Sequence, residues 1–251
     1  MVRYSIVSFK ASFQNGAPPL AAMHPGHGSP QSRARHTHRG GRPPREVSEQ
    51  ITHRIIAAAR ILFLRNGYGA TSMDALAATL GMSKRTVYVR FAGKAELFRA
   101  VVQAVIDRHL DAVEAIAAQG GNLREQLLAI GAQMIRSALD PDLVAIERVV
   151  TGEAQRFPEL ATLLGDAGAT RLPSLLADLL QQARGAGTDE EQACLDAEIF
   201  LTMVALPPLR RAVLNVDGHD DPRRISRTLH RQVDIYLHGI DATPRRSGSG
   251  T

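Results

Sequence analysis

The spacing of apolar residues constrains this chain more than any other feature, because it follows the helical period almost throughout. Between residues 48 and 238 apolar residues recur three or four positions apart, and no strand-like alternation of useful length occurs. In a helix this spacing places them on one face, which can be buried against another helix. Aromatic residues make up only 4% of the chain while Ala and Leu abound, and this mixture favours helices over sheets. The sequence therefore predicts an all-α fold.

Glycine, proline and capping residues divide this region into about nine predicted helices. The first is expected to end at Asn66-Gly67, with Gly67 in the left-handed conformation. Thr71 is expected to cap the second, with Asp74 three residues on, and Pro207-Pro208 to stop the eighth. The predicted helices span residues 48–66, 72–80, 84–90, 94–118, 123–139, 141–157, 159–184, 190–206 and 222–238.

Charge is distributed unevenly along the chain. Residues 1–45 hold seven basic and no acidic side chains, and residues 46–99 hold eight basic and four acidic ones, whereas residues 100–251 hold 15 basic and 21 acidic ones. A basic front suggests a polyanionic partner for that part, and a solvated basic tail is the alternative. Because residues 1–47 lack periodicity and are rich in Gly and Pro, they are predicted to form a disordered basic arm, and residues 241–251 a disordered tail.

Several classes of protein are disfavoured by what the sequence lacks. The single cysteine, Cys194, excludes an internal disulfide and favours a reducing compartment, so we expect the protein in the cytoplasm. No run of about 18 apolar residues and no unbroken apolar stretch near the N-terminus occurs, which predicts neither a membrane span nor a signal peptide. The arm contains four histidines but no cysteine partner, so neither a metal site nor a cofactor is expected; these are His24, His27, His36 and His38.

Catalytic motifs are also missing. The sequence contains no G-x-S-x-G, H-E-x-x-H, P-loop or G-x-G-x-x-G pattern. The histidines that follow the arm stand without a nucleophile at motif spacing: His53, His109, His219, His230 and His238. We therefore assign no catalytic residue, and a helical enzyme is the least favoured alternative.

Two short predicted helices meet across the four-residue turn Leu80-Gly81-Met82-Ser83. Gly81 permits the positive φ that such a turn demands. The second helix, at seven residues or about 10 Å, is too short to contribute much core. Val87 and Phe91 stand four residues apart and can anchor its inner side. The outward side carries Lys84, Arg85, Thr86, Tyr88 and Arg90.

A short helix with an apolar back and a basic, hydroxyl-rich front fits the major groove of DNA. Ser83 and the N-terminus of this helix can also bind a phosphate. The segment 72–91 is therefore predicted to be a DNA-binding helix-turn-helix. The alternative is an ordinary helical hairpin with a solvated basic face.

Residues 49–109 resemble the DNA-binding domain of the TetR family. The resemblance is carried by IIAAARILF at 55–63, GYGATSM at 67–73, GMSKRTVY at 81–88 and FAGKAELF at 91–98. It implies a DNA-binding domain over residues 48–110. It also implies that Tyr88 and Lys94 mainly bind phosphates, that Lys84, Arg85 and Thr86 are the better candidates for base contacts, and that Thr71 touches DNA as well.

Arginines in the arm extend this prediction. Arg42 and Arg45 stand just before the first helix, with prolines between them. Such an arm can lie along phosphates or enter the minor groove. A disordered tail with weak nonspecific attraction to DNA is the alternative.

Residues 122–240 resemble the family's regulatory domain much less sharply, and an effector-binding and dimerisation domain is expected over residues 111–240. The stretch ERVVTGEAQRFPEL at 147–160 is similar to one subgroup, the AcrR-like regulators. The resemblance implies a small-molecule effector and a dimer. Six apolar residues are candidates for the lining of an effector cavity, although residues of this kind more often belong to an ordinary core: Met134, Ile135, Val149, Leu176, Leu179 and Phe200.

The last two predicted helices carry apolar stripes, formed by Leu195, Ile199, Met203 and Leu206 and by Ile225, Leu229, Val233 and Tyr236. Two such helices from each of two chains would form a four-helix bundle, although the stripes can also pack within one chain. In a homodimer two recognition helices about 34 Å apart would contact successive major grooves of a palindrome.

These features together predict a DNA-binding transcriptional regulator. By family habit it is expected to be a repressor that a small-molecule effector releases from a palindromic operator. The effector is expected to tilt the long helix that begins at Lys94, moving the recognition helices off one-turn spacing. A nonspecific DNA-binding scaffold is the main alternative.

Overall fold

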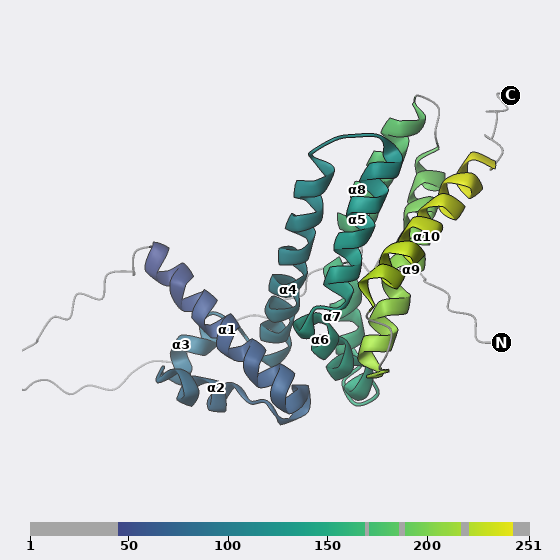
Figure 1. Cartoon of the computed structure of the whole chain (residues 1–251). Helices are drawn as coiled ribbons and strands as arrows, with labels where there is room; N and C mark the ends of the chain where they lie inside the picture. The colour runs from purple at the N-terminus through teal and green to yellow at the C-terminus, as the bar shows by residue number, and fades with distance from the viewer. Residues whose placement is uncertain (1–44, 169–170, 186–188, 217–220, 243–251) are drawn as a thin grey trace, which may run out of the picture. The chain divides into compact units, whose positions relative to one another are not determined.

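The computed structural model describes residues 45–168, 171–185, 189–216 and 221–242. Within these ranges every regular element is an α-helix, as predicted (Figure 1). The segment expected as one interrupted helix over 159–184 comprises α7 and α8. The helices are α1 (Arg45–Ala70), α2 (Met73–Leu80), α3 (Lys84–Tyr88), α4 (Lys94–Ala117), α5 (Leu123–Ala138), α6 (Pro141–Glu153), α7 (Glu159–Gly168), α8 (Arg171–Arg184), α9 (Glu190–Val213) and α10 (Pro222–Ala242).

The junction between α1 and α2 differs in detail from the prediction. Gly67 has the expected positive φ of 85°, but its ψ of 170° is extended rather than left-handed helical, so it kinks the chain. The prediction that Thr71 caps α2 is wrong. Its hydroxyl is buried and donates to Gly67 O at 2.8 Å and Leu62 O at 3.2 Å. Ser72 caps α2 instead, accepting from Ala75 N at 3.1 Å. Thr71 faces inward because carbonyls freed where the first helix ends need a donor.

A first apolar core unites the helix-turn-helix with two later helices. It is formed by α1, α2, α3, the first half of α4, α6 and α7. The rings of Phe63 and Phe98 meet edge to face at its centre, 5.1 Å apart. Its fully buried members include Phe63, Leu76, Val87, Phe98, Ile146 and Leu160.

A second apolar core is formed by the end of α4 with α5, α8, α9 and α10. Its fully buried members include Leu127, Ile130, Leu176, Leu180, Phe200 and Val233. It also holds polar groups that satisfy one another: Arg184 pairs with the Asp196 carboxylate at 2.7 Å, and the Tyr236 hydroxyl donates to Asp196 O at 2.8 Å. Burial raises the pKa of Tyr236, so its hydroxyl stays protonated as a donor. Because α4 contributes to both cores, the predicted domain boundary near residue 110 falls inside this helix.

We predicted that Pro207-Pro208 would end helix α9, but the helix continues to Val213. A proline lacks the N–H that would donate to the carbonyl four residues earlier. For Pro207 that carbonyl is Met203 O, and the side chain of Gln232 on α10 donates to it at 2.6 Å. The helix continues because a distant amide replaces one of the two missing donors.

Among the described residues one helix, α9, has the length and apolar content that crossing a membrane requires. A third of that stretch is buried inside the chain, where it packs between α5, α8 and α10. Its apolar residues therefore serve the second core on one side.

Candidate nucleic-acid interface and cavities

The turn between α2 and α3 has the geometry that the sequence predicts. Gly81 is left-handed, with φ 61° and ψ 28°, and its N–H donates to Ala78 O at 3.1 Å. A Cβ at Gly81 would meet no atom within 4 Å, so the glycine is needed for its backbone conformation and not for space. Ser83 caps α3 by accepting from Thr86 N at 3.1 Å. Figure 1 shows the resulting helix-turn-helix beside α1.

Helix α3 presents its polar front to solvent over a buried back. It spans only Lys84–Tyr88 rather than 84–90, because the last two residues form a turn. Val87 is fully buried and Phe91 nearly so, which confirms the predicted anchor. Lys84 and Arg85 are exposed and 47% of Tyr88 is accessible. These side chains can therefore reach a duplex that approaches α3.

Several predicted DNA-binding side chains already have partners in the chain. Lys84 pairs with Asp74 of α2 at 2.5 Å. The hydrogen bond to that carboxylate raises the pKa of Lys84, so its side chain stays protonated. Thr86 shares a hydrogen bond with Ser83 at 2.8 Å between hydroxyl oxygens. Arg90 donates to Thr86 O at 3.0 Å and is partly buried. Lys84 and Ser83 are exposed, so these contacts are open to exchange with phosphates.

Two predicted contacts lie elsewhere. The buried hydroxyl of Thr71 donates to backbone carbonyls. The side chain therefore lies inside the DNA-binding domain of residues 48–110, which we call the head, and not on the surface that would face DNA. Lys94 is partly buried and donates to Tyr68 O at 2.9 Å and Gly69 O at 3.2 Å, with its Nζ 4.4 Å from the centre of the Tyr68 ring. Arg42 and the side chain of Arg45 lie outside the described residues.

A carboxylate on α6 binds the same segment, residues 67–70 at the kinked end of α1, which we call the loop before α2. Glu153 accepts from Tyr68 N and from Gly69 N, each at 2.7 Å, with one oxygen for each. A Cβ at Gly67 or Gly69 would lie 2.5 Å or 2.9 Å from these oxygens, so both glycines leave room for the carboxylate. We call this arrangement, with Lys94 on the loop carbonyls, the Glu153 clamp. Sequence reasoning missed it because Glu153 stands more than 80 positions away from the loop.

A cavity of about 630 Å³ lies between the two cores, and we call it the seam cavity. Its apolar wall combines side chains that pack with the first core, such as Ile106, Leu143 and Leu164, with others that pack with the second, such as Val113, Met134 and Leu172. The polar residues on its wall are His109, Ser137 and Glu147. This composition, largely apolar with a few polar groups, is typical of small-molecule sites.

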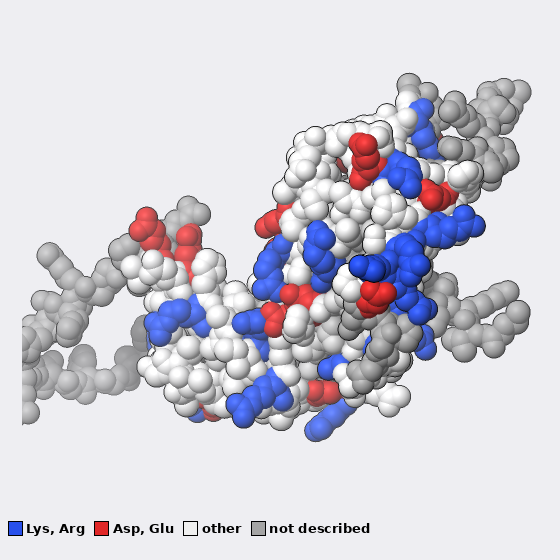
Figure 2. All heavy atoms as spheres, in the orientation of Figure 1, with Lys and Arg blue, Asp and Glu red and all other residues white. Residues whose placement is uncertain are grey.

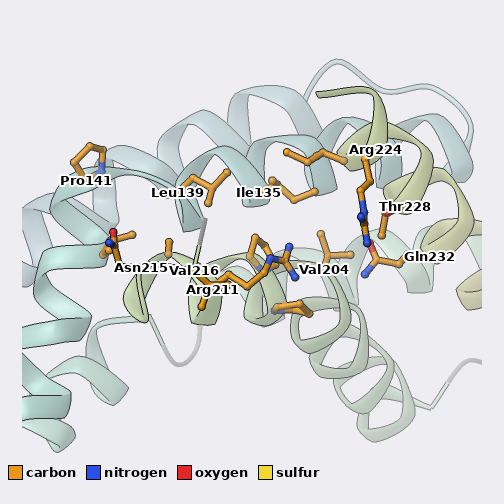
Figure 3. Close-up of a pocket in the computed structure, with 15 residues that line it drawn as sticks. Ile135, Leu139, Pro141, Val204, Arg211, Asn215, Val216, Arg224, Thr228 and Gln232 are labelled. Carbon is orange, nitrogen blue, oxygen red and sulfur yellow. The ribbon is translucent and has the colours of Figure 1, made fainter. Parts of the chain in front are cut away.

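A second pocket of about 410 Å³ lies between α5, α6, α9 and α10, and we call it the arginine pocket (Figure 3). Ile135, Leu139 and Val204 contribute apolar surface, while Arg211 and Arg224 supply positive charge, and none of the described residues that line it is acidic. Figure 2 shows further Arg side chains gathered over α10. The exposed arginines of this helix are Arg223, Arg224, Arg227 and Arg231.

Only one of the six predicted effector residues lines the seam cavity. Met134 does, whereas Ile135 lines the arginine pocket. The other four line neither pocket: Leu176, Leu179 and Phe200 are buried in the second core, and Val149 packs against the first core. These side chains lie at the centres of helix packing rather than at the seam, which periodicity alone does not distinguish.

The predicted dimer stripes also divide. On α9, Leu195, Ile199 and Leu206 are half-exposed and share one side of the helix. On α10, the stripe of Leu229, Val233 and Tyr236 is buried within the chain, contrary to the prediction, and Ile235 is exposed instead. The apolar stripe of an amphipathic helix favours burial, but the sequence does not show whether the same chain or a second copy buries it.

Comparison with known proteins fits this geometry. Residues 55–101 match the family described as bacterial regulatory proteins, tetR family, and residues 125–239 match the C-terminal domain of the AefR-like transcriptional repressors. An uncharacterised HTH-type transcriptional regulator of Mycobacterium tuberculosis is 30% identical over 144 residues, which cover 57% of this chain and 67% of that protein. The chain belongs to the TetR family. It is thus a DNA-binding regulator of a family that is not enzymatic.

Solved structures of TetR-family regulators resemble this one along most of its length. A putative TetR-family regulator from Mesorhizobium loti superimposes with a TM-score of 0.67 at 25% identity, covering 76% of this chain and 97% of the other. The flavonoid-responsive regulator FrrA superimposes with a TM-score of 0.62 at 27% identity, with the same coverage of each chain. The helix-turn-helix and the helical C-terminal domain therefore form the fold of this family.

Proposed function

We propose that this TetR-family regulator acts in the cytoplasm as a homodimeric repressor that a small-molecule effector releases from a palindromic operator. The observation that carries the proposal is the construction of α3. Its back, at Val87, is fully buried while its basic front, at Lys84 and Arg85, is exposed. Such a helix can enter a major groove without disturbing the core behind it. The match of the C-terminal domain to AefR-like repressors supports repression.

The exposed front of α3 divides by chemistry into base and phosphate contacts. Lys84, Arg85 and Thr86 can donate to base edges, and Arg85 suits guanine because its guanidinium can donate two hydrogen bonds at once. Tyr88, Ser83 and Arg90 can donate to phosphates. Lys84 must exchange Asp74 for DNA, which costs little because this ion pair is exposed. We assign Lys94 a supporting role, since it holds the loop before α2.

Dimerisation supplies the second recognition helix that a five-residue α3 needs. The exposed apolar residues of α9, Leu195, Ile199 and Leu206, and Ile235 on α10 are the proposed interface. Two copies of this face would bury it in a four-helix bundle. The two α3 helices would then lie about one helical turn of DNA apart.

The seam cavity is the proposed effector site, and α6 connects it to the DNA-binding head. Leu143, Glu147 and Val150 of α6 line the cavity, and Glu153 at the end of the same helix holds the loop before α2. A ligand that favours a different packing of α6 against α4 would therefore shift the head. It shifts this equilibrium only by its difference in affinity for the two states.

Nuclease footprinting of DNA upstream of the encoding gene and its neighbours tests the proposal. We expect one protected palindrome and, in transcription assays with that template, less transcript when the protein is added. Uniform protection would favour a nonspecific DNA-binding scaffold. More transcript would contradict repression.

A further inference from the structure

The seam cavity holds an acidic side chain without a compensating base. Among the described side chains that line it, Glu147 is the acid and His109 the other titratable group, and none is Lys or Arg. The described residues offer Glu147 no hydrogen bond or ion pair. Burial without a partner raises the pKa of Glu147, since the carboxylate gives up water and receives nothing in return.

The basic side chains next to these two residues are bound to other groups. Arg148, which follows Glu147, donates to Ala212 O at 2.6 Å and Val213 O at 2.9 Å at the end of α9. Arg108, which precedes His109, lies 3.3 Å from Asp142 and 3.4 Å from Asp140. Neither arginine is therefore available to neutralise Glu147.

A second polar atom of the wall also lacks a partner. The Nε2 atom of His109 is buried and forms no hydrogen bond with the described residues, and the nearest carboxylate, Asp140, is 3.7 Å away. Buried polar atoms are normally satisfied, so an unpaired one beside a cavity points to a missing partner in that cavity. His109 therefore adds an unsatisfied polar atom next to the carboxylate-bearing wall, whose other polar side chain is Ser137.

We propose that the seam cavity takes an apolar molecule that carries a protonated amine, and that Glu147 binds the ammonium group. This inference rests on the proposed function, in which the seam cavity is the effector site. An ammonium donates hydrogen bonds and neutralises the carboxylate at once. A hydroxyl group donates a hydrogen bond but leaves the charge uncompensated, and a carboxylate would repel it.

The arginine pocket gives the opposite selection in the same domain. Arg211 and Arg224 line it without an acid among the described residues of its wall, so we expect an anionic molecule to bind there and not at the seam. The two pockets therefore predict different ligands by charge. Arg211→Gln provides a matched control for a change at Glu147, since each substitution removes one charge from one pocket.

Three probes with the same alkyl chain test the inference: decylamine, decanol and decanoate, titrated into the full-length protein by calorimetry. We expect decylamine to bind about tenfold more tightly than decanol, as a charge-assisted hydrogen bond predicts, and decanoate to bind the seam cavity least. Glu147→Gln should remove the preference for the amine while decanol affinity stays within about threefold, which shows that the cavity is intact. Arg211→Gln should leave amine binding unchanged.

Two results would overturn the inference: decanoate binding as tightly as decylamine in Arg211→Gln, or an amine preference that survives Glu147→Gln. Decanoate binding that disappears in Arg211→Gln alone belongs to the arginine pocket and agrees with the inference. The footprint without any ligand tests the regulator separately. Amine binding that depends on Glu147 supports the ligand assignment even without a footprint, and a footprint without such binding overturns that assignment alone.

Discussion

The two apolar cores are assembled in different ways, although both are helical and both use α4. The first core joins the helix-turn-helix to α6 and α7, so the DNA-binding head shares its buried side chains with two helices of the C-terminal half. The second joins α5, α8, α9 and α10 and holds a buried ion pair between Arg184 and Asp196. The boundary between the cores therefore lies within the C-terminal half and not at the end of the DNA-binding motif.

This difference shows where a ligand can act. The seam cavity takes its wall from both cores, and α6, which belongs to the first, ends in the Glu153 clamp. In the proposed mechanism, a ligand at the seam would change how the head, together with α6 and α7, packs against the proposed dimer helices. No flexible linker is needed, because two rigid cores can have two discrete packings.

The largest expected effects come from emptying each core in turn. Phe98 and Phe200 are fully buried in the first and second core respectively. Phe98→Ala and Phe200→Ala should each lower the free energy of unfolding by about 3–5 kcal/mol, measured by urea denaturation. Only Phe98→Ala should also weaken operator binding by the folded protein. If Phe200→Ala left stability unchanged and weakened ligand binding, Phe200 would line the effector cavity, as the sequence analysis predicted.

Removing the Glu153 clamp should separate the head from the seam. Glu153→Ala leaves two backbone N–H groups without their acceptor, and we expect the free energy of unfolding to fall by about 2–4 kcal/mol. Operator affinity should fall too and should respond less to ligand. Gln155→Ala, two residues on and exposed, is the control and should change neither. Equal behaviour of the two variants would mean that the clamp carries no coupling.

Within the head, substitutions on α3 should split according to whether the side chain binds a base or a phosphate. Arg85→Ala should cost about 1–3 kcal/mol for the operator and relax preference at one base pair. Tyr88→Phe should weaken binding to all sequences alike, because it removes a hydrogen bond to a phosphate. It should leave the salt dependence unchanged, since a neutral hydroxyl neutralises no phosphate charge. Binding titrations at several salt concentrations on operator and scrambled DNA measure both. The division of roles fails if the variants are weakened equally on both DNAs.

Local features of the head could be predicted because short-range geometry decides them. The positive φ of Gly81 follows from the tight turn, and the burial of Val87 and Phe91 follows from their spacing of four. Thr71 could not be placed, since its hydroxyl answers carbonyls that appear only when Gly67 kinks the chain. The Glu153 clamp joins residues 84 and 85 positions apart, which no local pattern records.

In the C-terminal half, periodicity located the helices but not what covers their faces. The α10 stripe at Leu229 and Val233 is as apolar as the α9 stripe at Leu195 and Ile199, yet only the α10 stripe is buried within the chain. Likewise, apolar residues of one helix line the seam cavity or are buried in a core, depending on how that helix is rotated about its axis. This rotation depends on the packing of several helices at once.

The smallest expected effect concerns how α9 passes its prolines, and it belongs wholly to the second core. Gln232 donates to Met203 O because Pro207 lacks an N–H, so Gln232→Ala should lower the free energy of unfolding by about 1 kcal/mol. In a Pro207→Ala background the restored N–H can donate to the same carbonyl. Gln232→Ala should then cost almost nothing, and a double-mutant cycle by urea denaturation measures this coupling. Additive effects would show that Gln232 stabilises α10 in some other way. Operator binding should stay unchanged throughout, because no residue of the first core is altered.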